Sequence, residues 1–195
     1  MRVNYLTLVL CLFAGCSFPE PSKKLTAEEC FDRERSKVVH RALKKFIKKM
    51  EANGYHAAGI GEGLDHSHGR EKERQNYLAV TFDIERLPNI EFARKVEIEA
   101  LQELQRYINS EEGIQDYVAE YPYPIKFLNI AFISKLRDID LCMVSNFEEE
   151  IYYYKDEPGK PLQGPLIEVH RESYQDAIQI LEREQSCPVD SVILP

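Results

Sequence analysis

The sequence predicts an α+β fold, a single antiparallel sheet of about four to five strands with about three helices packed on one face. Three observations predict it. Residues 26–53 and 91–110 carry apolar side chains at helical spacing. Residues 76–85 alternate apolar and polar side chains, as a half-buried strand does. Predicted elements follow in the order helix, strand, strand, helix, strand, strand, strand, helix, which favours one layer of helices on one sheet.

The first helix is expected at residues 26–53. Thr26 and Glu29 have the spacing of a capping box, and Asn53-Gly54 is a typical helix end. The apolar stripe comprises Phe31, Val38, Val39, Ala42, Leu43, Phe46, Ile47 and Met50. The opposite face is basic and carries Lys37, Arg41, Lys44, Lys45 and Lys48. We expect that face to be solvated, and contact with anionic lipid is the alternative.

The remaining elements follow from apolar periodicity and turn residues. Asn89 is the expected cap of helix 91–110, whose buried stripe would be Phe92, Val96, Ala100, Leu104 and Ile108. Ser173 is the expected cap of a last helix, which ends at Glu184. A short helix is expected at 112–121. Strands are expected at 55–64, where the chain enters a Gly-rich turn, at 76–85, at 126–134 in the sheet centre, and at 139–144 and 150–155 as a hairpin around Ser145-Asn146. A further short strand at 166–169 is left open.

The beginning of the chain has the order of an export signal. Arg2 precedes an apolar core, Tyr5–Phe13, and Ala14-Gly15 are small residues before Cys16. The core is too short to span a bilayer, which takes about 20 apolar residues. This arrangement resembles the lipobox of bacterial lipoproteins, although Phe13 stands where that family usually has Leu. An ordinary secretory signal with a chance cysteine is the alternative.

The resemblance implies an address. Residues 1–15 would be a signal peptide, and the thiol of Cys16 would receive a diacylglycerol. Residues 16–25, which hold two prolines, would be a flexible tether to a single globular domain at 26–195. Attachment by two or three acyl chains is stable, whereas a single chain binds only reversibly. The expected location is therefore the bacterial cell membrane or outer membrane, with the domain in the periplasm or at the cell surface.

A second resemblance covers about residues 37–182. It rests on Ala93-Arg94, on Leu101–Ser110, on Tyr117 and on Glu172–Ala177. These stretches resemble a family of small uncharacterised exported bacterial lipoproteins. The family carries no known activity, so the resemblance implies a fold and an address only.

The charge composition of the chain argues against one class of partner, nucleic acid. The chain has 25 Lys+Arg against 33 Asp+Glu, a formal net charge of −8. Such a chain repels nucleic acid, so we expect no nucleic-acid partner. No cofactor is expected either, because the Gly59–Gly63 stretch has GxGxG spacing without the GK[ST] ending of a P-loop. We interpret those glycines as a bulge and a tight turn that need positive φ.

The cysteines outside the export signal predict structure rather than catalysis. Cys142 lies in an apolar run and is expected to be a buried small hydrophobe, which argues against a thiol–imidazole pair with His170. A Cys30–Cys187 disulfide is possible in an oxidising periplasm. No serine sits in a GxSxG motif.

The most suggestive chemical cluster is His56, Asp65, His66 and His68. His66 and His68 would share a face of a strand, with Asp65 as an oxygen ligand. A tethered metal-dependent hydrolase is therefore the alternative function. The flanking residues are typical of a solvated polar loop, so we predict no metal site and no catalytic residue.

Three consecutive tyrosines lie in the expected strand 150–155. Strand alternation places Tyr152 and Tyr154 on one face and Tyr153 on the other. We expect ordinary sheet packing with the hydroxyls at the rim, and an aromatic binding patch that also includes Tyr121 and Tyr123 is the alternative. From the anchor and the lack of a coherent catalytic set, the sequence predicts a lipid-anchored, non-enzymatic domain that binds another protein of the cell envelope or supports the envelope.

Overall fold

The structure is a computed structural model that describes residues 27–64, 76–118, 120–136, 141–160 and 164–186. Contacts between Cα atoms divide the chain into residues 1–34 and residues 35–195. The account below concerns the second unit. The predicted export signal, the expected lipidation site Cys16, the expected tether and the expected Thr26 cap lie outside the described residues.

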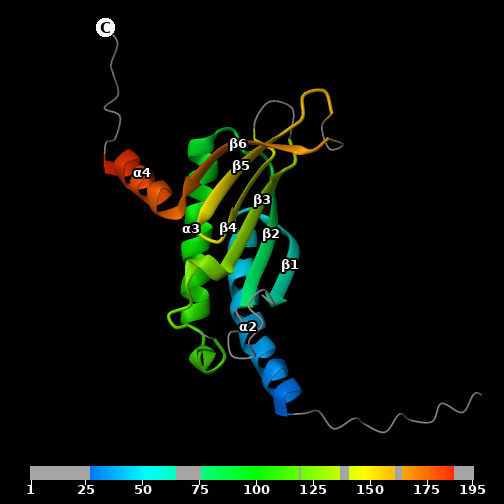
Figure 1. Cartoon of the computed structure of the whole chain (residues 1–195), viewed down its shortest axis with the longest axis vertical. Helices are drawn as coiled ribbons and strands as arrows, with labels where there is room; N and C mark the ends of the chain where they lie inside the picture. The colour runs from blue at the N-terminus through cyan, green and yellow to red at the C-terminus, as the bar shows by residue number, and fades with distance from the viewer. Residues whose placement is uncertain (1–26, 65–75, 119, 137–140, 161–163, 187–195) are drawn as a thin grey trace, which may run out of the picture. The chain divides into compact units, whose positions relative to one another are not determined.

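One sheet of six strands and three helices make up the fold, which confirms the predicted α+β class. The strand count is slightly higher than predicted. In chain order the elements are α2 (Ala27–Ala52), β1 (His56–Leu64), β2 (Asn76–Ile84), α3 (Ile90–Asn109), the 3₁₀ turns η1 (Ile114–Asp116) and η2 (Ile125–Phe127), β3 (Leu128–Ser134), β4 (Met143–Phe147), β5 (Glu150–Asp156), β6 (Leu166–Ser173) and α4 (Tyr174–Ser186) (Figure 1).

The strands lie in sequence order, β1 to β6, and the sheet is mixed rather than antiparallel. β2 and β3 pair in parallel from Leu78 opposite Leu128 to Ile84 opposite Ser134, whereas the other neighbouring pairs are antiparallel. The cause is α3, because a helix between two neighbouring strands returns the chain to the end of the sheet where it started.

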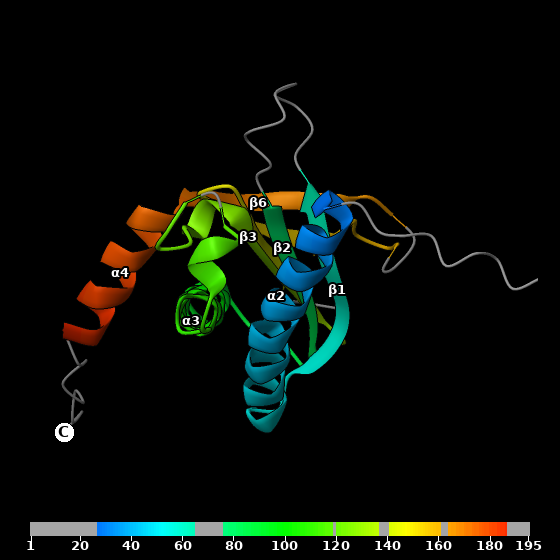
Figure 2. The same cartoon turned by 90° about the horizontal axis from the view of Figure 1, so that it is seen from below.

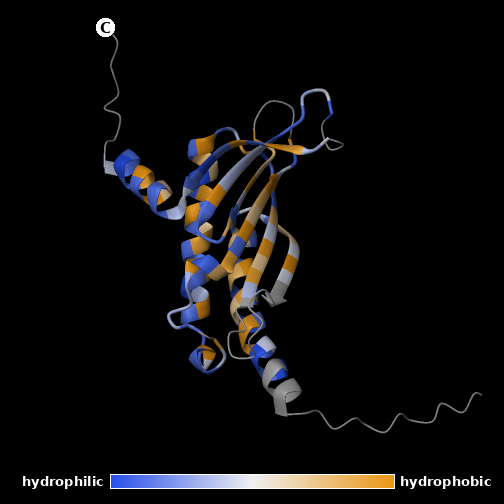
Figure 3. Cartoon of the chain, in the orientation of Figure 1, coloured by the Kyte–Doolittle hydropathy of each residue, from blue (hydrophilic) through white to orange (hydrophobic). Residues whose placement is uncertain are grey.

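The helices lie on one side of the sheet (Figure 2). Phe46 of α2 meets Phe82 of β2 edge to face, with ring centroids 5.7 Å apart. Phe82 in turn stacks on Phe132 of β3 at 5.5 Å. All three rings are fully buried. The core therefore sits between the helices and strands β2 and β3, whose residues are mostly hydrophobic in Figure 3.

An ion-pair network also ties α2 to the end of α3. The carboxylate of Glu111 accepts hydrogen bonds from Arg41 Nε at 2.7 Å and Lys45 Nζ at 2.6 Å. Its side chain is only 6% exposed, and the two cations lower its pKa. Arg41 and Lys45 belong to the basic helix face that we expected to be solvated, so part of that face serves to hold the fold together.

Several local predictions are confirmed. The Asn89 side chain accepts a hydrogen bond from Phe92 N at 2.8 Å, and Ser173 Oγ accepts one from Asp176 N at 3.0 Å, so both residues cap their helices. Phe92 itself was placed wrongly, because its side chain is 38% exposed. The expected helix 112–121 is only the short turn η1, which follows Gly113 at φ 80°.

The β4–β5 hairpin turns later than expected, at Glu148-Glu149 rather than Ser145-Asn146. Glu148 takes the left-handed conformation at φ 56°. Asn146 stays in the strand because its side chain bonds β3, with Oδ1 accepting from Ile130 N at 2.7 Å and Nδ2 donating to Leu128 O at 2.6 Å. These two bonds continue the strand pairing where the β3–β4 ladder stops.

The Gly59–Gly63 stretch forms part of strand β1 and is not a turn. A register shift between Ala57 and Gly59 confirms the expected bulge. Neither Gly59 nor Gly61 has a positive φ, and a Cβ at either would meet only Thr81 or Ala79 at ordinary contact distances of 3.9 and 3.6 Å. These glycines leave the adjoining surface flat rather than cradling a phosphate.

Candidate functional site

The face of the sheet that points away from the helices is the candidate site, and we call it the open face. Strand alternation assigns its residues, because every second side chain of β2 to β5 is buried under the helices. The open face carries Gly59, Gly61, Tyr77, Ala79, Thr81, Asp83, Asn129, Ala131, Ile133, Met143, Ser145, Phe147, Glu150, Tyr152, Tyr154, Asp156, Glu168 and Arg171.

The middle of the open face is made of small side chains. One row crosses the sheet from Thr81 through Ala131 to Ser145, each opposite the next on the neighbouring strand. Gly59 extends the row on β1, and Tyr152 continues it on β5. Small residues on four successive strands leave a flat strip on which another chain can come close to the sheet.

Two stacked aromatic pairs border this strip. Tyr152 and Tyr154 of β5 have ring centroids 6.3 Å apart and planes inclined by 15°. Tyr77 of β2 and Phe147 of β4 lie 6.4 Å apart with planes inclined by 12°. Phe147 is 53% exposed. Large aromatic side chains that keep exposed surface are enriched at protein–protein contacts.

The charges of the open face are mainly negative. Asp83, Glu150, Asp156 and Glu168 lie on it, together with the cation Arg171. Arg171 donates to Glu168 through Nε at 3.1 Å and Nη2 at 2.9 Å, and its guanidinium lies 4.8 Å from the centroid of the Tyr152 ring. The tyrosine pair and its carboxylate neighbour therefore already hold one guanidinium, by cation–π contact and ion pairing.

A second polar cluster lies under the helices, on the opposite face. Arg94 of α3 donates through Nε to Glu172 Oε1 at 2.8 Å, and its Nη1 lies 3.4 Å from Glu184 Oε1 of α4. The Tyr153 hydroxyl donates to the same oxygen of Glu172. The side chains of Arg94 and Glu172 are 7% and 6% exposed. Burial, together with the hydrogen bond to Glu172, raises the pKa of Tyr153.

Glu97 lies one helical turn beyond Arg94 and is completely buried. Neither carboxyl oxygen has a hydrogen-bond partner within the described parts of the chain. Burial therefore raises its pKa well above the ordinary value, and the Asn146 backbone opposes this shift. A buried carboxyl group without a cation beside it keeps its proton. The cluster is thus a closed structural contact between α3, α4 and the sheet, with His170, 3.7 Å from Glu172 Oε2, at its edge.

Of the four residues considered as metal ligands, the structure describes only His56. His56 is an exposed residue at the start of β1, opposite Asp83. Asp65, His66 and His68 lie outside the described residues. Within the described ranges, no group of three or more His, Cys, Asp or Glu side chains is arranged to hold a metal ion.

Cys142 is fully buried, which confirms the prediction. Its thiol donates to Tyr154 O at 3.3 Å, whereas the His170 ring packs against Tyr153 with centroids 5.4 Å apart. The side chain of Cys30 and the whole of Cys187 lie outside the described residues, so a disulfide between them is not tested.

The tyrosines that the sequence offered as an alternative patch only partly share one face. Tyr152 and Tyr154 share the open face and Tyr153 points into the core, as alternation requires. Tyr123 does not belong to the patch, because it is 3% exposed and packs on Phe127. Tyr77 and Phe147, which the sequence analysis did not single out, take its place.

Comparison with models of protein families, with curated proteins and with solved structures returned no match. Of the helices in the described part of the chain, none has the length and apolar character that a bilayer span needs.

Proposed function

We propose that this protein is a lipid-anchored interaction module of the bacterial cell envelope, attached through Cys16, and that its open face binds a basic segment of another envelope protein. The observation that carries the proposal is the open face itself. Three helices cover one side of the sheet, and the other side carries two stacked aromatic pairs around a strip of small residues.

Charge supports a basic partner. The open face carries Asp83, Glu150, Asp156 and Glu168 against Arg171, and the whole chain has a formal net charge of −8. Carboxylates beside aromatic rings favour arginine and lysine side chains, as the contact of Arg171 with Tyr152 illustrates. Such complementarity speeds association and selects partners.

The distribution of polar groups supports binding rather than catalysis. The strongest concentration of ionisable side chains, around Arg94 and Glu172, is sealed between α3, α4 and the sheet. Its members bond one another, and a substrate would need an exposed reacting group. On the open face the accessible features are aromatic rings and a flat strip, which suit a contact surface.

The docking part of the proposal is tested by site-specific photocrosslinking in intact cells. A photoreactive amino acid replaces Ser145, in the centre of the open face, or Gln179, an exposed residue of α4, as the matched control. The Ser145 probe should give a discrete adduct, and mass spectrometry should place the crosslink in a Lys/Arg-rich segment. The adduct should disappear when Tyr152→Ser and Tyr154→Ser are combined.

Equal adducts from both positions, or an adduct that survives the tyrosine substitutions, would contradict docking on the open face. The anchor is tested separately with a fatty-acid probe. The full chain should take up label and the Cys16→Ser variant should not, because the thiol is the expected acceptor. Label on the Cys16→Ser variant would contradict the anchor and leave the docking test unaffected.

A further inference from the structure

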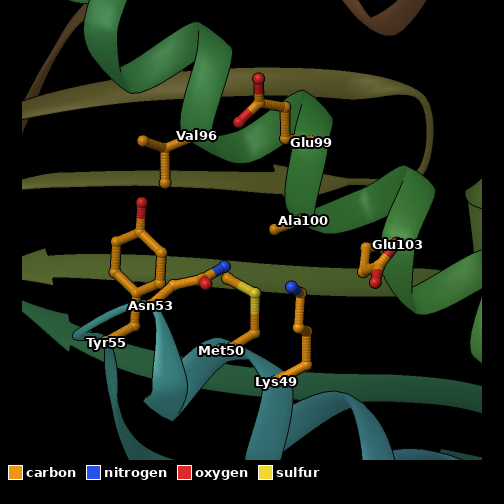
Figure 4. A pocket seen from close by; sticks show the side chains of 8 residues that line it. All are labelled: Lys49, Met50, Asn53, Tyr55, Val96, Glu99, Ala100 and Glu103. Carbon is orange, nitrogen blue, oxygen red and sulfur yellow. The ribbon is translucent and has the colours of Figure 1, made fainter.

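A pocket of about 340 Å³ opens between the end of α2 and the middle of α3, on the helix side of the sheet and away from the open face. It is lined by Lys49, Met50, Asn53, Tyr55, Val96, Glu99, Ala100 and Glu103 (Figure 4). The volume is at the lower end of the range of small-molecule sites.

The floor of the pocket is apolar and firmly held. Met50, Val96 and Ala100 are each 5% exposed or less. The Tyr55 ring forms a side of the pocket and packs edge to face on Phe132, with centroids 5.3 Å apart. Asn53 and Tyr55 are positioned by backbone bonds from their N–H groups to Met50 O at 3.0 and 3.2 Å. The pocket is thus part of the packed structure.

Three polar groups that make no hydrogen bond with the described residues line the same pocket: the hydroxyl of Tyr55, the side-chain amide of Asn53 and the ammonium of Lys49. Lys49 and Tyr55 do interact with the opposite wall, because Lys49 helps to lower the pKa of Glu103 and Glu99 helps burial to raise the pKa of Tyr55. All three can donate a hydrogen bond to a ligand. An apolar floor with a few convergent polar groups is the usual composition of a small-molecule site.

The two walls carry opposite charges. Lys49 comes from α2, whereas Glu99 and Glu103 come from α3 (Figure 4). Glu103 is already held by Arg106, whose Nη2 lies 2.6 Å from Oε1 and whose Nε lies 3.0 Å from Oε2. Glu99 has only a loose contact with Lys95, at 3.9 Å between two exposed groups. Glu99 is therefore the carboxylate that remains available.

These charges select the class of ligand. A simple anion would meet Glu99, Glu103 and the carbonyl end of α2, which all repel it. A simple cation would meet the ammonium of Lys49. A molecule with one carboxylate and one ammonium on an apolar body satisfies both walls and covers the floor between them.

We infer that this pocket binds a small apolar zwitterion, an amino acid or short peptide. The ligand carboxylate lies toward Lys49, Asn53 and the Tyr55 hydroxyl, and its ammonium lies toward Glu99. This site is separate from the open face and does not depend on the proposed docking function.

The test is calorimetric titration of the full chain with leucine and with alanylleucine, beside two blocked probes. Leucinamide lacks the carboxylate, and N-acetylleucine lacks the ammonium. We expect a Kd of about 1 mM or tighter for at least one unblocked probe, with each blocked form weaker by about tenfold. No binding of either unblocked probe up to about 10 mM would overturn the inference.

Substitutions then test which wall contacts which end of the ligand. Each double-mutant-type cycle combines one protein variant with one blocked probe. In Lys49→Met the preference for leucine over leucinamide should vanish, and in Glu99→Gln the preference over N-acetylleucine should vanish. Lys48→Met and Glu112→Gln, exposed changes outside the pocket, should keep both preferences. If Lys49→Met and Glu99→Gln still bind leucine better than both leucinamide and N-acetylleucine, the ligand does not bind in this pocket.

Discussion

The two faces of strand β5 differ more than their sequence suggests. Tyr153 lies on the helix side, where it is fully buried and donates its hydroxyl to Glu172. Its neighbours Tyr152 and Tyr154 stack on each other on the open face and keep part of their surface exposed. One residue type thus serves two purposes, and the direction of the side chain decides which.

The comparison shows where polar groups are self-sufficient. On the helix side, Arg94 and Tyr153 both donate to Oε1 of the buried Glu172, so a change there should reduce stability. On the open face, the ion pair of Glu168 with Arg171 is exposed, so a change there should affect binding more than stability. Four predictions test this division, from the largest expected effect on stability to the smallest.

Glu172→Ala should lower the free energy of unfolding by about 3–5 kcal/mol, because it leaves the buried guanidinium of Arg94 without its close carboxylate. Glu168→Ala is the matched control on the same strand. Its ion pair with Arg171 is exposed, so its loss should cost about 1 kcal/mol or less. Urea denaturation measures both. Equal losses would contradict the contrast between the faces.

Glu97→Gln should make the protein less sensitive to high pH. The pKa of Glu97 in the folded state is raised well above its ordinary value of 4.5. The stability that depends on the Glu97 proton is therefore fully present below pH 4.5. It is lost as pH rises through the folded pKa, with a slope of up to about 1.4 kcal/mol per pH unit. The stability of Glu97→Gln relative to the parent should therefore grow between pH 5 and pH 8. A pH-independent difference in urea midpoints would show that Glu97 ionises freely.

Asn146→Ala should lower the free energy of unfolding by about 1–3 kcal/mol, since it leaves Ile130 N and Leu128 O buried without partners. Ser145→Ala, on the open face of the same strand, should change it by about 0.5 kcal/mol or less. Thermal unfolding of the two variants compares adjacent residues that face opposite ways. A loss in Ser145→Ala as large as that in Asn146→Ala would contradict the assignment.

Much of the fold is readable from the sequence because local patterns agree with the final packing. The alternation of Leu78, Val80, Phe82 and Ile84 predicts the buried side of β2, and Asn89 and Ser173 cap their helices as expected. The prediction that β3 pairs with β2 in the antiparallel direction was wrong, because apolar alternation is the same in parallel and antiparallel strands. The length of the β2–β3 connection, which contains a helix, was the signal that could have indicated a parallel pair.

The site was harder to predict because it depends on which strands become neighbours. Alternation alone gives the shared face of Tyr152 and Tyr154, but the partnership of Tyr77 and Phe147 requires the register of β2, β3 and β4. The Arg94–Glu172 pair joins residues 78 positions apart. Its only local trace is Arg94 and Glu97 on the apolar side of α3, where a charge without a partner would be costly.

The fourth prediction tests docking on the open face most directly. The affinity of the photocrosslinked partner is measured for the full chain and for the variant that combines Tyr152→Ser with Tyr154→Ser. We predict a loss of binding free energy of about 2 kcal/mol or more, with a loss of unfolding free energy of only about 1 kcal/mol. Unchanged affinity in a variant that remains folded would contradict the proposed function.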